Sequence, residues 1–329
     1  MQVLVTGGAG YIGSQMVRQL VEKKIDTVVI DSLENGHRGA VPASVPLFAG
    51  HTGDAKFLDD VFARYSFDAV IHFAAYLAVK ESVEHPDKYF RNNIVGTLTL
   101  LETMLKHNVK RFVFSSTCAT YGITTQVPIP ENHPQHPINP YGESKLIVEQ
   151  MLKWLDSSMG LRSIALRYFN ASGAELDGSH GEDHPDEPHI IPVALYAVRN
   201  NKPFMIYGED YNTRDGTCIR DYIHTIDLCN AHSVALDALM NGHATTAYNV
   251  GTGTGYSNKE IADAVRKVTG IDFEIKKGPR RPGDPDELVG DASKLRNDLG
   301  WSPHHSDIET IIGSAWKWHR LHPNGYADK

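Results

Sequence analysis

Short apolar runs alternate with segments of helical periodicity through the first half of the chain. Buried strands are expected in five such runs, at residues 3–6, 27–31, 69–75, 111–117 and 163–169. Helices are expected between them, at residues 14–23, 93–107 and 143–155. Continuous apolar strands that alternate with helices are typical of a parallel sheet covered on both faces. The pattern therefore predicts an α/β fold with a doubly wound parallel sheet.

The regular alternation ends near residue 170. Three loops rich in Gly, Pro and charged residues follow, at residues 173–188, 208–216 and 278–285. Long loops in compact proteins often carry function. We expect a first domain at residues 1–170, with a returning segment near 225–255 that brings residues 248–250 back to the sheet as a strand. Residues 171–329 are expected to form a smaller α/β substrate lobe.

A glycine-rich turn joins the first strand to the first helix. The run from Gly7 to Gly13 reads GGAGYIG, and Asp31 ends the next strand 18 residues past Gly13. Glycines let the backbone approach a pyrophosphate, and the helix N-terminus offers unpaired N–H groups to it. A carboxylate at Asp31 would accept hydrogen bonds from a ribose and repel a 2′-phosphate, which favours NAD over NADP. Strand, glycine turn, helix and acid together predict a Rossmann-type NAD site.

Composition excludes several other classes of function. The 329 residues carry a net charge of −8 and a pI near 6.1, which argues against nucleic acid as a partner. Three widely spaced cysteines, Cys118, Cys218 and Cys229, form neither a disulfide framework nor a zinc pattern. No signal peptide and no run of about 20 apolar residues is found, so a cytoplasmic protein without a membrane partner is expected.

A tyrosine and a lysine lie four residues apart at the start of a predicted helix. Tyr141 and Lys145 would share one face of that helix, and Thr117 ends the strand at residues 111–117. Together they make a proton-transfer unit. A free tyrosine has a pKa near 10, and lowering it to about 7 requires roughly 4 kcal/mol. The Lys145 ammonium and a positive nicotinamide ring are the expected sources.

These motifs resemble the extended short-chain dehydrogenase/reductase family. The resemblance rests on the opening TGGAGYIG, the hydroxyl of Thr117 and the YGESK run from Tyr141 to Lys145. It implies that Tyr141 is the acid and base, that Lys145 assists it, and that Thr117 bonds the substrate oxygen.

Over nearly the whole chain the sequence is similar to UDP-glucose 4-epimerases. Four runs carry this resemblance, at residues 115–122 (SSTCATYG), 167–170 (RYFN), 215–224 (DGTCIRDYIH) and 280–284 (RRPGD). It implies reversible 4-epimerisation of UDP-galactose and UDP-glucose through a 4-keto sugar, in a homodimer. Arginine forks suit a diphosphate, and an Asp can hold a uridine ribose.

The resemblance also implies two sets of binding residues. The cofactor set is Gly7, Gly10, Tyr11, Ile12, Gly13, Asp31, Ser32, Asn35, His51, Thr52, Phe73, Ala74, Ala75, Asn92, Lys145 and Phe169. The substrate set is Thr117, Tyr141, Asn170, His189, Tyr207, Arg220, Arg281, Asp284 and Leu288. Two residues depart from the family pattern: His51 stands where an Asp usually holds the adenine, and Leu77 stands where some members carry a Lys. Both concern cofactor affinity.

Two other functions remain as alternatives. Sugar-nucleotide dehydratases resemble this chain, but they place an Asp-Glu pair after the Thr, whereas Cys118 and Ala119 follow Thr117 here. A redox-sensing NAD-binding protein would keep the fold but would have no use for Tyr141 and Lys145. No metal site is predicted, because His180 and His184 are expected to lie in a solvated loop.

Two finer expectations concern assembly and specificity. The helices at 93–107 and 143–155 carry more apolar residues than one core face needs, which predicts a four-helix dimer contact. The apolar residues concerned are Leu98, Leu101, Leu105, Leu146, Ile147, Met151, Leu152, Trp154 and Leu155. Leu288 lies seven positions after Arg281, where the family's pocket faces the sugar 2-substituent. A bulky Tyr there excludes an N-acetyl group, so leucine predicts secondary activity on UDP-N-acetylgalactosamine.

Overall fold

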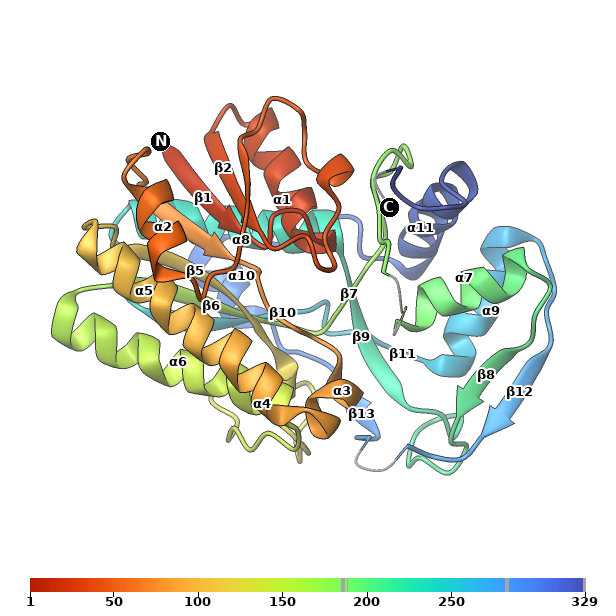
Figure 1. The fold of residues 1–329 in the computed structure, drawn as a ribbon. Helices are drawn as coiled ribbons and strands as arrows, with labels where there is room; N and C mark the ends of the chain where they lie inside the picture. The colour runs from red at the N-terminus through yellow and green to blue at the C-terminus, as the bar shows by residue number, and fades with distance from the viewer. Residues whose placement is uncertain (185–186, 188, 282–283, 328–329) are drawn as a thin grey trace.

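The computed structural model describes residues 1–184, 187, 189–281 and 284–327. A seven-stranded parallel sheet forms its larger part, in the order β10-β6-β5-β4-β1-β2-β3 (Figure 1). The strands are β1 (Gln2–Thr6), β2 (Asp26–Asp31), β3 (Leu47–Ala49), β4 (Ala69–His72), β5 (Arg111–Thr117), β6 (Arg162–Tyr168) and β10 (Thr246–Val250). This order confirms the Rossmann-type sheet, and β10 confirms the strand expected at residues 248–250.

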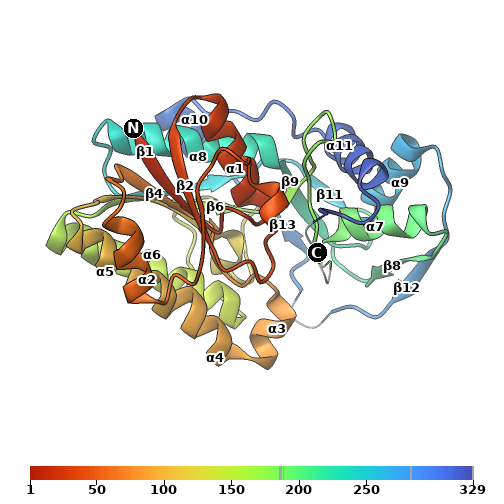
Figure 2. The same cartoon turned by 45° about the horizontal axis from the view of Figure 1, so that its top comes forward.

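Helices cover both faces of this sheet, which is why its strands are apolar throughout (Figure 2). Alternate residues divide between the faces: Val3 and Val5 join one core, and Leu4 joins the other. The first core is covered by α1 (Tyr11–Glu22), α8 (Thr225–Met240) and α10 (Ser293–Leu299). The second is covered by α2 (Ala55–Phe62), α5 (Thr97–Lys106) and α6 (Pro140–Met159).

The remaining elements form a second lobe with its own apolar core (Figure 1). Its helices are α7 (Ile190–Arg199), α9 (Asn258–Thr269) and α11 (Ile308–Leu321). Its strands are β7 (Asn170–Ser172), β8 (Phe204–Tyr207), β9 (Ile219–His224), β11 (Gly255–Ser257), β12 (Ile275–Gly278) and β13 (Glu287–Leu288). The division of the chain at residue 170 stays a prediction, because α8 and β10 lie with the large sheet.

Short helical segments complete the chain. They are η1 (Arg38–Ala40), α3 (Val79–Glu84), α4 (Pro86–Tyr89), η2 (Phe90–Gly96) and η3 (Cys118–Thr120). The continuous α-helix predicted at residues 93–107 is wrong in its first turn, because η2 is a π-helix. There the buried Asn93 side chain bonds the backbone N–H and C=O of Tyr76, at 2.9 and 3.0 Å. Such π-turns are frequent at functional sites.

Two predicted boundaries also shift. The strand expected at 69–75 ends at His72, because the N–H groups of Phe73 and Ala74 both turn to the Thr6 carbonyl, at 2.8 and 3.1 Å. The helix expected at 143–155 runs from Pro140 to Met159. Asn139 caps its start, and Gly160 ends it with φ of 68°.

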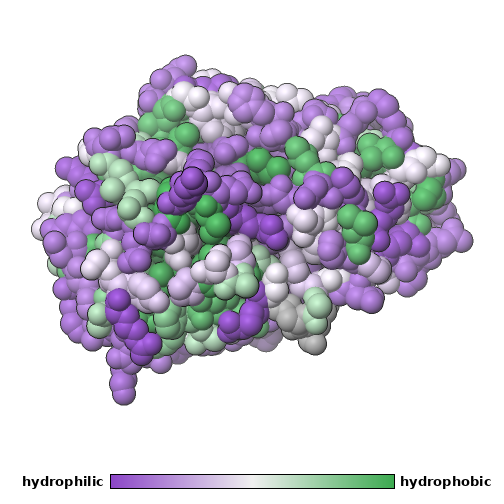
Figure 3. Space-filling view, turned by 90° about the horizontal axis from the view of Figure 1, so that it is seen from above, coloured by the Kyte–Doolittle hydropathy of each residue, from purple (hydrophilic) through white to green (hydrophobic). Residues whose placement is uncertain are grey.

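The outer surface is mostly hydrophilic in the view of Figure 3, with hydrophobic residues in small groups. Among the described residues, no helix combines the length and the apolar composition needed to cross a bilayer.

A buried ion pair joins α6 to the end of β6. Arg167 and Glu149 have side chains only 4% and 3% exposed, and their closest N···O distance is 2.6 Å. Ser116 donates to the same carboxylate at 2.5 Å, and Arg167 donates to the Tyr121 hydroxyl at 2.9 Å. Every member of this network is therefore satisfied, which a buried charge requires.

We predict that Glu149→Ala lowers the free energy of unfolding by about 3–5 kcal/mol, because it leaves the Arg167 charge buried and unpaired. The matched control is Asp156→Ala on the same helix, whose partner Arg162 is half exposed. That change should cost at most about 1 kcal/mol. Urea denaturation of both variants makes the comparison, and equal losses would contradict the assignment of a buried pair.

Candidate functional site

The glycine turn after β1 leaves no room for side chains. Gly7 has φ of +71°, and a Cβ there would lie 2.5 Å from the backbone nitrogen of Ala74. A Cβ at Gly13 would lie 2.0 Å from the Gly7 carbonyl oxygen. No side chain caps the N-terminus of α1, where Gly10 is the N-cap and Tyr11 and Ile12 open the helix. The first N–H groups of α1 are thus available to an anion.

Asp31 is oriented by the backbone around it. One carboxylate oxygen accepts from Ala9 N at 2.9 Å and the other from Leu33 N at 2.8 Å. Burial raises the pKa of Asp31, and these N–H groups oppose the rise. The carboxylate is therefore fixed at the end of β2, with lone pairs left for ribose hydroxyls. Ser32 and the exposed Asn35 follow in the same loop.

The other expected cofactor residues follow neighbouring strands. Phe73, Ala74 and Ala75 leave β4 beside the glycine turn, and Thr52 is buried behind β3. Asn92 donates to Asn93 at 3.0 Å. The two residues that depart from the family pattern are exposed: His51 lies 3.5 Å from Glu34, and Leu77 is 42% exposed.

The start of α6 places the tyrosine against the end of β5. A Cβ at Gly142 would lie 2.5 Å from the carbonyl oxygen of Ala119, so only glycine permits this approach. Tyr141 hydrogen-bonds the side chain of Thr117. One turn further on, Lys145 is 4% exposed and donates to the Ser115 carbonyl at 2.9 Å. The three expected catalytic residues are therefore brought together.

The protein groups alone shift these pKa values in a direction that was not expected. Burial raises the pKa of Tyr141 to about 12, although the hydrogen bond with Thr117 lowers it. Burial also lowers the pKa of Lys145 to about 7. The expectation that Lys145 and a nicotinamide ring together lower the pKa of Tyr141 stays a prediction; in the protein by itself, desolvation penalises both charged forms.

A second set of polar residues surrounds the start of β9. Arg220 pairs with Asp284 at 2.5 Å and donates to the Pro285 carbonyl at 2.9 Å. Asp284 also accepts from Tyr211 at 3.0 Å. The Arg281 guanidinium lies 4.5 Å from the centre of the Tyr207 ring. Pro282 and Gly283 of the RRPGD run lie outside the described residues.

The small sheet aligns two further members of the substrate set, Leu288 and Asn170. Arg220 pairs in register with Leu288, and Asn170 with Tyr222. Asn170 also donates to the Asp221 carbonyl at 2.9 Å. Leu288 packs against an apolar cluster that includes Phe169, Tyr121 and Ile129, and Cys118 packs against the same cluster. Leu288 is thus linked to the strand end that carries Thr117.

The loop after β7 is not solvated, so that expectation is wrong. His180 is 1% exposed, and its ring nitrogens bond Ser14 at 2.9 Å and Tyr326 at 2.7 Å. The described part of the loop also contains a compact group of two acids and two imidazoles. We call it the histidine–glutamate cluster: Glu182, His184, Glu187 and His189.

This cluster lies between Tyr11, a predicted cofactor-binding residue, and helix α7 of the second lobe. His189 is the N-cap of α7, and the Tyr11 and His184 rings meet edge-on at 6.2 Å. Burial opposes protonation of the histidines, but the carboxylates outweigh it and raise the pKa of His184 to about 9 and that of His189 to about 10. Sequence reasoning placed His189 in the substrate set and rejected His184, with His180, as a metal ligand, although the HxxExH spacing was a visible signal.

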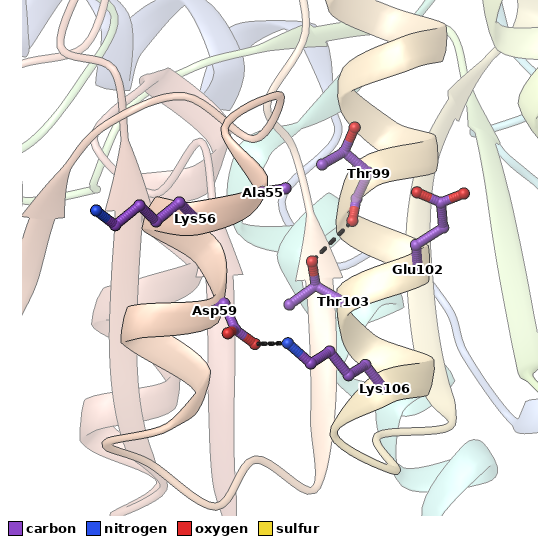
Figure 4. A pocket seen from close by; sticks show the side chains of 7 residues that line it. All are labelled: Ala55, Lys56, Asp59, Thr99, Glu102, Thr103 and Lys106. Carbon is purple, nitrogen blue, oxygen red and sulfur yellow. Dashed lines mark hydrogen bonds and ion pairs between the residues drawn. The ribbon is translucent and has the colours of Figure 1, made fainter.

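A surface hollow between α2 and α5 contains none of the predicted site residues (Figure 4). An ion pair of 2.8 Å between Lys106 and Asp59 crosses it. Its lining residues are Ala55, Lys56, Asp59, Thr99, Glu102, Thr103 and Lys106. The hollow plays no part in the site described above.

Comparison with known proteins gives consistent results. A family model described as GDP-mannose 4,6 dehydratase matches residues 4–313. The UDP-glucose 4-epimerase of Streptococcus mutans is 51% identical, over 100% of both chains. The Bifidobacterium longum UDP-glucose 4-epimerase, solved with NAD⁺ and UDP, superposes with a TM-score of 0.94 at 38% identity, over 99% of this chain and 100% of that one. The UDP-Glc/GlcNAc 4-epimerase of Campylobacter jejuni superposes with a TM-score of 0.85 at 41% identity, over 97% and 99%.

Proposed function

This chain belongs to the family of UDP-glucose 4-epimerases, NAD-dependent isomerases, and from that premise we propose how its residues interconvert UDP-galactose and UDP-glucose. One observation carries the proposal. Tyr141, Lys145 and Thr117 meet at the end of β5, and Cys118 and Ala119 stand where a dehydratase would need its acid pair. The site can therefore move a proton at a hydroxyl but lacks the groups for elimination.

Tyr141 is the base in this proposal. Its phenolate takes the proton of the sugar 4-hydroxyl, and Thr117 holds the same oxygen by a hydrogen bond. Bound NAD supplies the acceptor, and afterwards the donor, for the hydride at C4. The 4-keto sugar turns over in the pocket and receives the hydride on its other face, while Tyr141 returns the proton. No net oxidation results, so no external reductant is needed.

The pKa shifts of Tyr141 and Lys145 indicate when Tyr141 can act as a base. Burial places the pKa of Tyr141 near 12 and that of Lys145 near 7. A positive charge that arrives with the cofactor would oppose the first shift. Proton abstraction is thereby favoured in the loaded site. Lys145, anchored on Ser115, holds the tyrosine's helix in place and assists it when protonated.

The second lobe is proposed to hold the nucleotide. Arg220 and Arg281 suit the two phosphates of UDP, and Asp284 suits its ribose. Asn170, Tyr207 and His189 complete the set. The domain division proposed above places these residues in the substrate lobe and the dinucleotide on the large sheet.

We place the protein in the cytoplasm, because Cys118, Cys218 and Cys229 are all free thiols, which fits a reducing compartment.

We predict that Tyr141→Phe lowers kcat by roughly 10²–10⁴-fold and leaves the protein folded with NAD bound. The assay follows UDP-glucose formed from UDP-galactose without added reductant, beside the absorbance of bound cofactor. Tyr196→Phe, on the exposed face of α7, is the control and should keep full activity. Near-normal turnover by Tyr141→Phe would refute its role, and a wild-type protein that binds NAD without turnover would favour the sensor alternative.

Leu288 is proposed to set which sugars are accepted. It is half-buried on β13, in register with Arg220 and packed on the Phe169 cluster. Leucine is shorter than tyrosine and leaves more room beside the sugar 2-substituent. The similarity to the Campylobacter jejuni enzyme, named for both glucose and N-acetylglucosamine, supports this assignment.

We predict that Leu288→Tyr selectively lowers activity on UDP-N-acetylgalactosamine relative to UDP-galactose. A steric clash of about 1–3 kcal/mol gives a change of roughly 10–200-fold in the ratio of kcat/KM values. The volume-conserving Leu288→Met should leave the ratio nearly unchanged. An unchanged ratio in Leu288→Tyr would show that another side chain fills the pocket.

A homodimer through α5 and α6 is proposed from their exposed apolar residues. Leu98 is 37% and Trp154 is 74% exposed, and Ile147 and Met151 lie on the same stripe of α6 as Trp154. Part of the expected contact is wrong, because these residues are buried against the sheet: Leu101, Leu146 and Leu152. The stripe that remains exposed still suits a two-fold contact.

We predict that wild-type protein is a dimer at micromolar concentration and that the double variant Leu98→Asp/Trp154→Asp is a monomer by light scattering. Two carboxylates would be buried without partners in the contact, which is costly. Ile271→Asp, an exposed apolar site in the second lobe, should stay dimeric. A monomeric wild type would refute the proposal.

A further inference from the structure

In the histidine–glutamate cluster, one nitrogen of each imidazole lies close to two carboxylates. His184 Nδ1 lies 3.2 Å from Glu182 and 3.3 Å from Glu187. His189 Nδ1 lies 2.5 Å from Glu182 and 3.2 Å from Glu187. Each Nδ1 carries at most one hydrogen, yet each faces two carboxylates. One ligand atom from each of the four residues lies within 4.8 Å of the other three.

The imidazole–carboxylate distances are close to the edges of a tetrahedron around a small cation, with His184 facing Oε2 of Glu187 and His189 facing Oε1. Metal–ligand bonds of about 2.0–2.1 Å, as in zinc sites, give tetrahedral edges of roughly 3.3 Å. Three of the four measured imidazole–carboxylate distances are 3.2 or 3.3 Å. The fourth, between His189 and Glu182, is shorter by less than 1 Å and would open as the ion enters.

Charge and chemistry select the kind of ion. With neutral imidazoles the cluster carries two negative charges, and a divalent cation neutralises them. Two nitrogens and two oxygens suit zinc and its neighbours, whereas Mg²⁺ and Ca²⁺ prefer oxygen ligands alone. The Glu182 side chain is 4% exposed and His189 is 34% exposed, so the site has a buried wall and an open side for the ion.

The surroundings hold the ligands in place. The Trp318 indole donates to the Glu182 carbonyl at 2.9 Å, and Glu187 accepts from the backbone N–H of His189 at 2.8 Å. The Tyr11 ring closes the side of His184 that faces the glycine turn. Such outer partners orient metal ligands and tune their affinity.

We propose that the histidine–glutamate cluster binds one Zn²⁺ ion in a four-coordinate site. The ion links the loop after β7 to the N-terminus of α7. It also fixes the position of His184, whose ring contacts Tyr11. Its role is structural, because all four positions are filled by protein; His189 would coordinate through Nδ1, which leaves Nε2 for the substrate contact proposed above. It is separate from the proton transfer at Tyr141.

The test titrates the full NAD-loaded chain with Co²⁺ at mildly alkaline pH, where the metal must displace the protons that Glu182 and Glu187 stabilise on His184 and His189, so binding should release protons. One equivalent should produce the intense visible bands of tetrahedral cobalt, and Zn²⁺ should abolish them by displacement. His184→Gln and Glu187→Gln should each weaken Zn²⁺ binding by at least about 10-fold. His107→Gln, which removes another His–acid pair of 2.7 Å, should bind like the wild type.

Two results would overturn the proposal. One is wild-type protein that binds no equivalent of either metal, which leaves the cluster as ion pairs alone. The other is a weak, six-coordinate spectrum that both ligand variants retain, which means metal bound elsewhere. The wild-type titration decides the question even where a variant fails to fold, and it is independent of turnover.

Discussion

The parallel register of the central sheet is the constraint on which the rest of the structure depends. Thr6 lies beside Ile30 on one side and His72 on the other, and His72 lies beside Phe114. The carboxyl ends of four strands therefore open onto one edge. Parallel strands need crossover connections, most of which are helical here, and those connections begin at that edge. Glycine turn, ribose acid and catalytic hydroxyl meet because of this topology.

One face of α6 lies against the end of β5 and brings the proposed catalytic side chains together. Positions 141, 145 and 149 recur every four residues and meet three consecutive residues of β5. The contacts are Tyr141 with Thr117, Lys145 with the Ser115 carbonyl, and Glu149 with Ser116. The buried guanidinium of Arg167 pairs with the Glu149 carboxylate and fixes its position. The helix is thus fixed along its length, which restricts the phenol to one position relative to the strand.

Apolar periodicity and residue spacing predicted those parts of the site that lie on long helices and strands. Apolar runs located five strands of the sheet, and the spacing of Tyr141 and Lys145 needed only one helix face. The register of β13 on β9, which brings Leu288 beside Arg220, was not predictable, because a two-residue strand has no periodicity of its own. The family resemblance placed both residues in the substrate set but did not predict their pairing. The loop after β7 was misjudged because its polar composition suggested solvent, whereas its polar groups bond one another and Ser14.

In the proposed site, the nucleotide end would work by exchange of partners. Arg220 already has two acceptors, the Asp284 carboxylate and the Pro285 carbonyl. A diphosphate must therefore replace a charge-assisted bond of similar kind, and only the difference between the two contributes to affinity. Asp284, once released, keeps its bond from Tyr211 and becomes free to accept from a ribose. Phosphate and ribose then favour each other's binding, because each receives the group that the other frees, so a sugar diphosphate without its nucleoside would gain little.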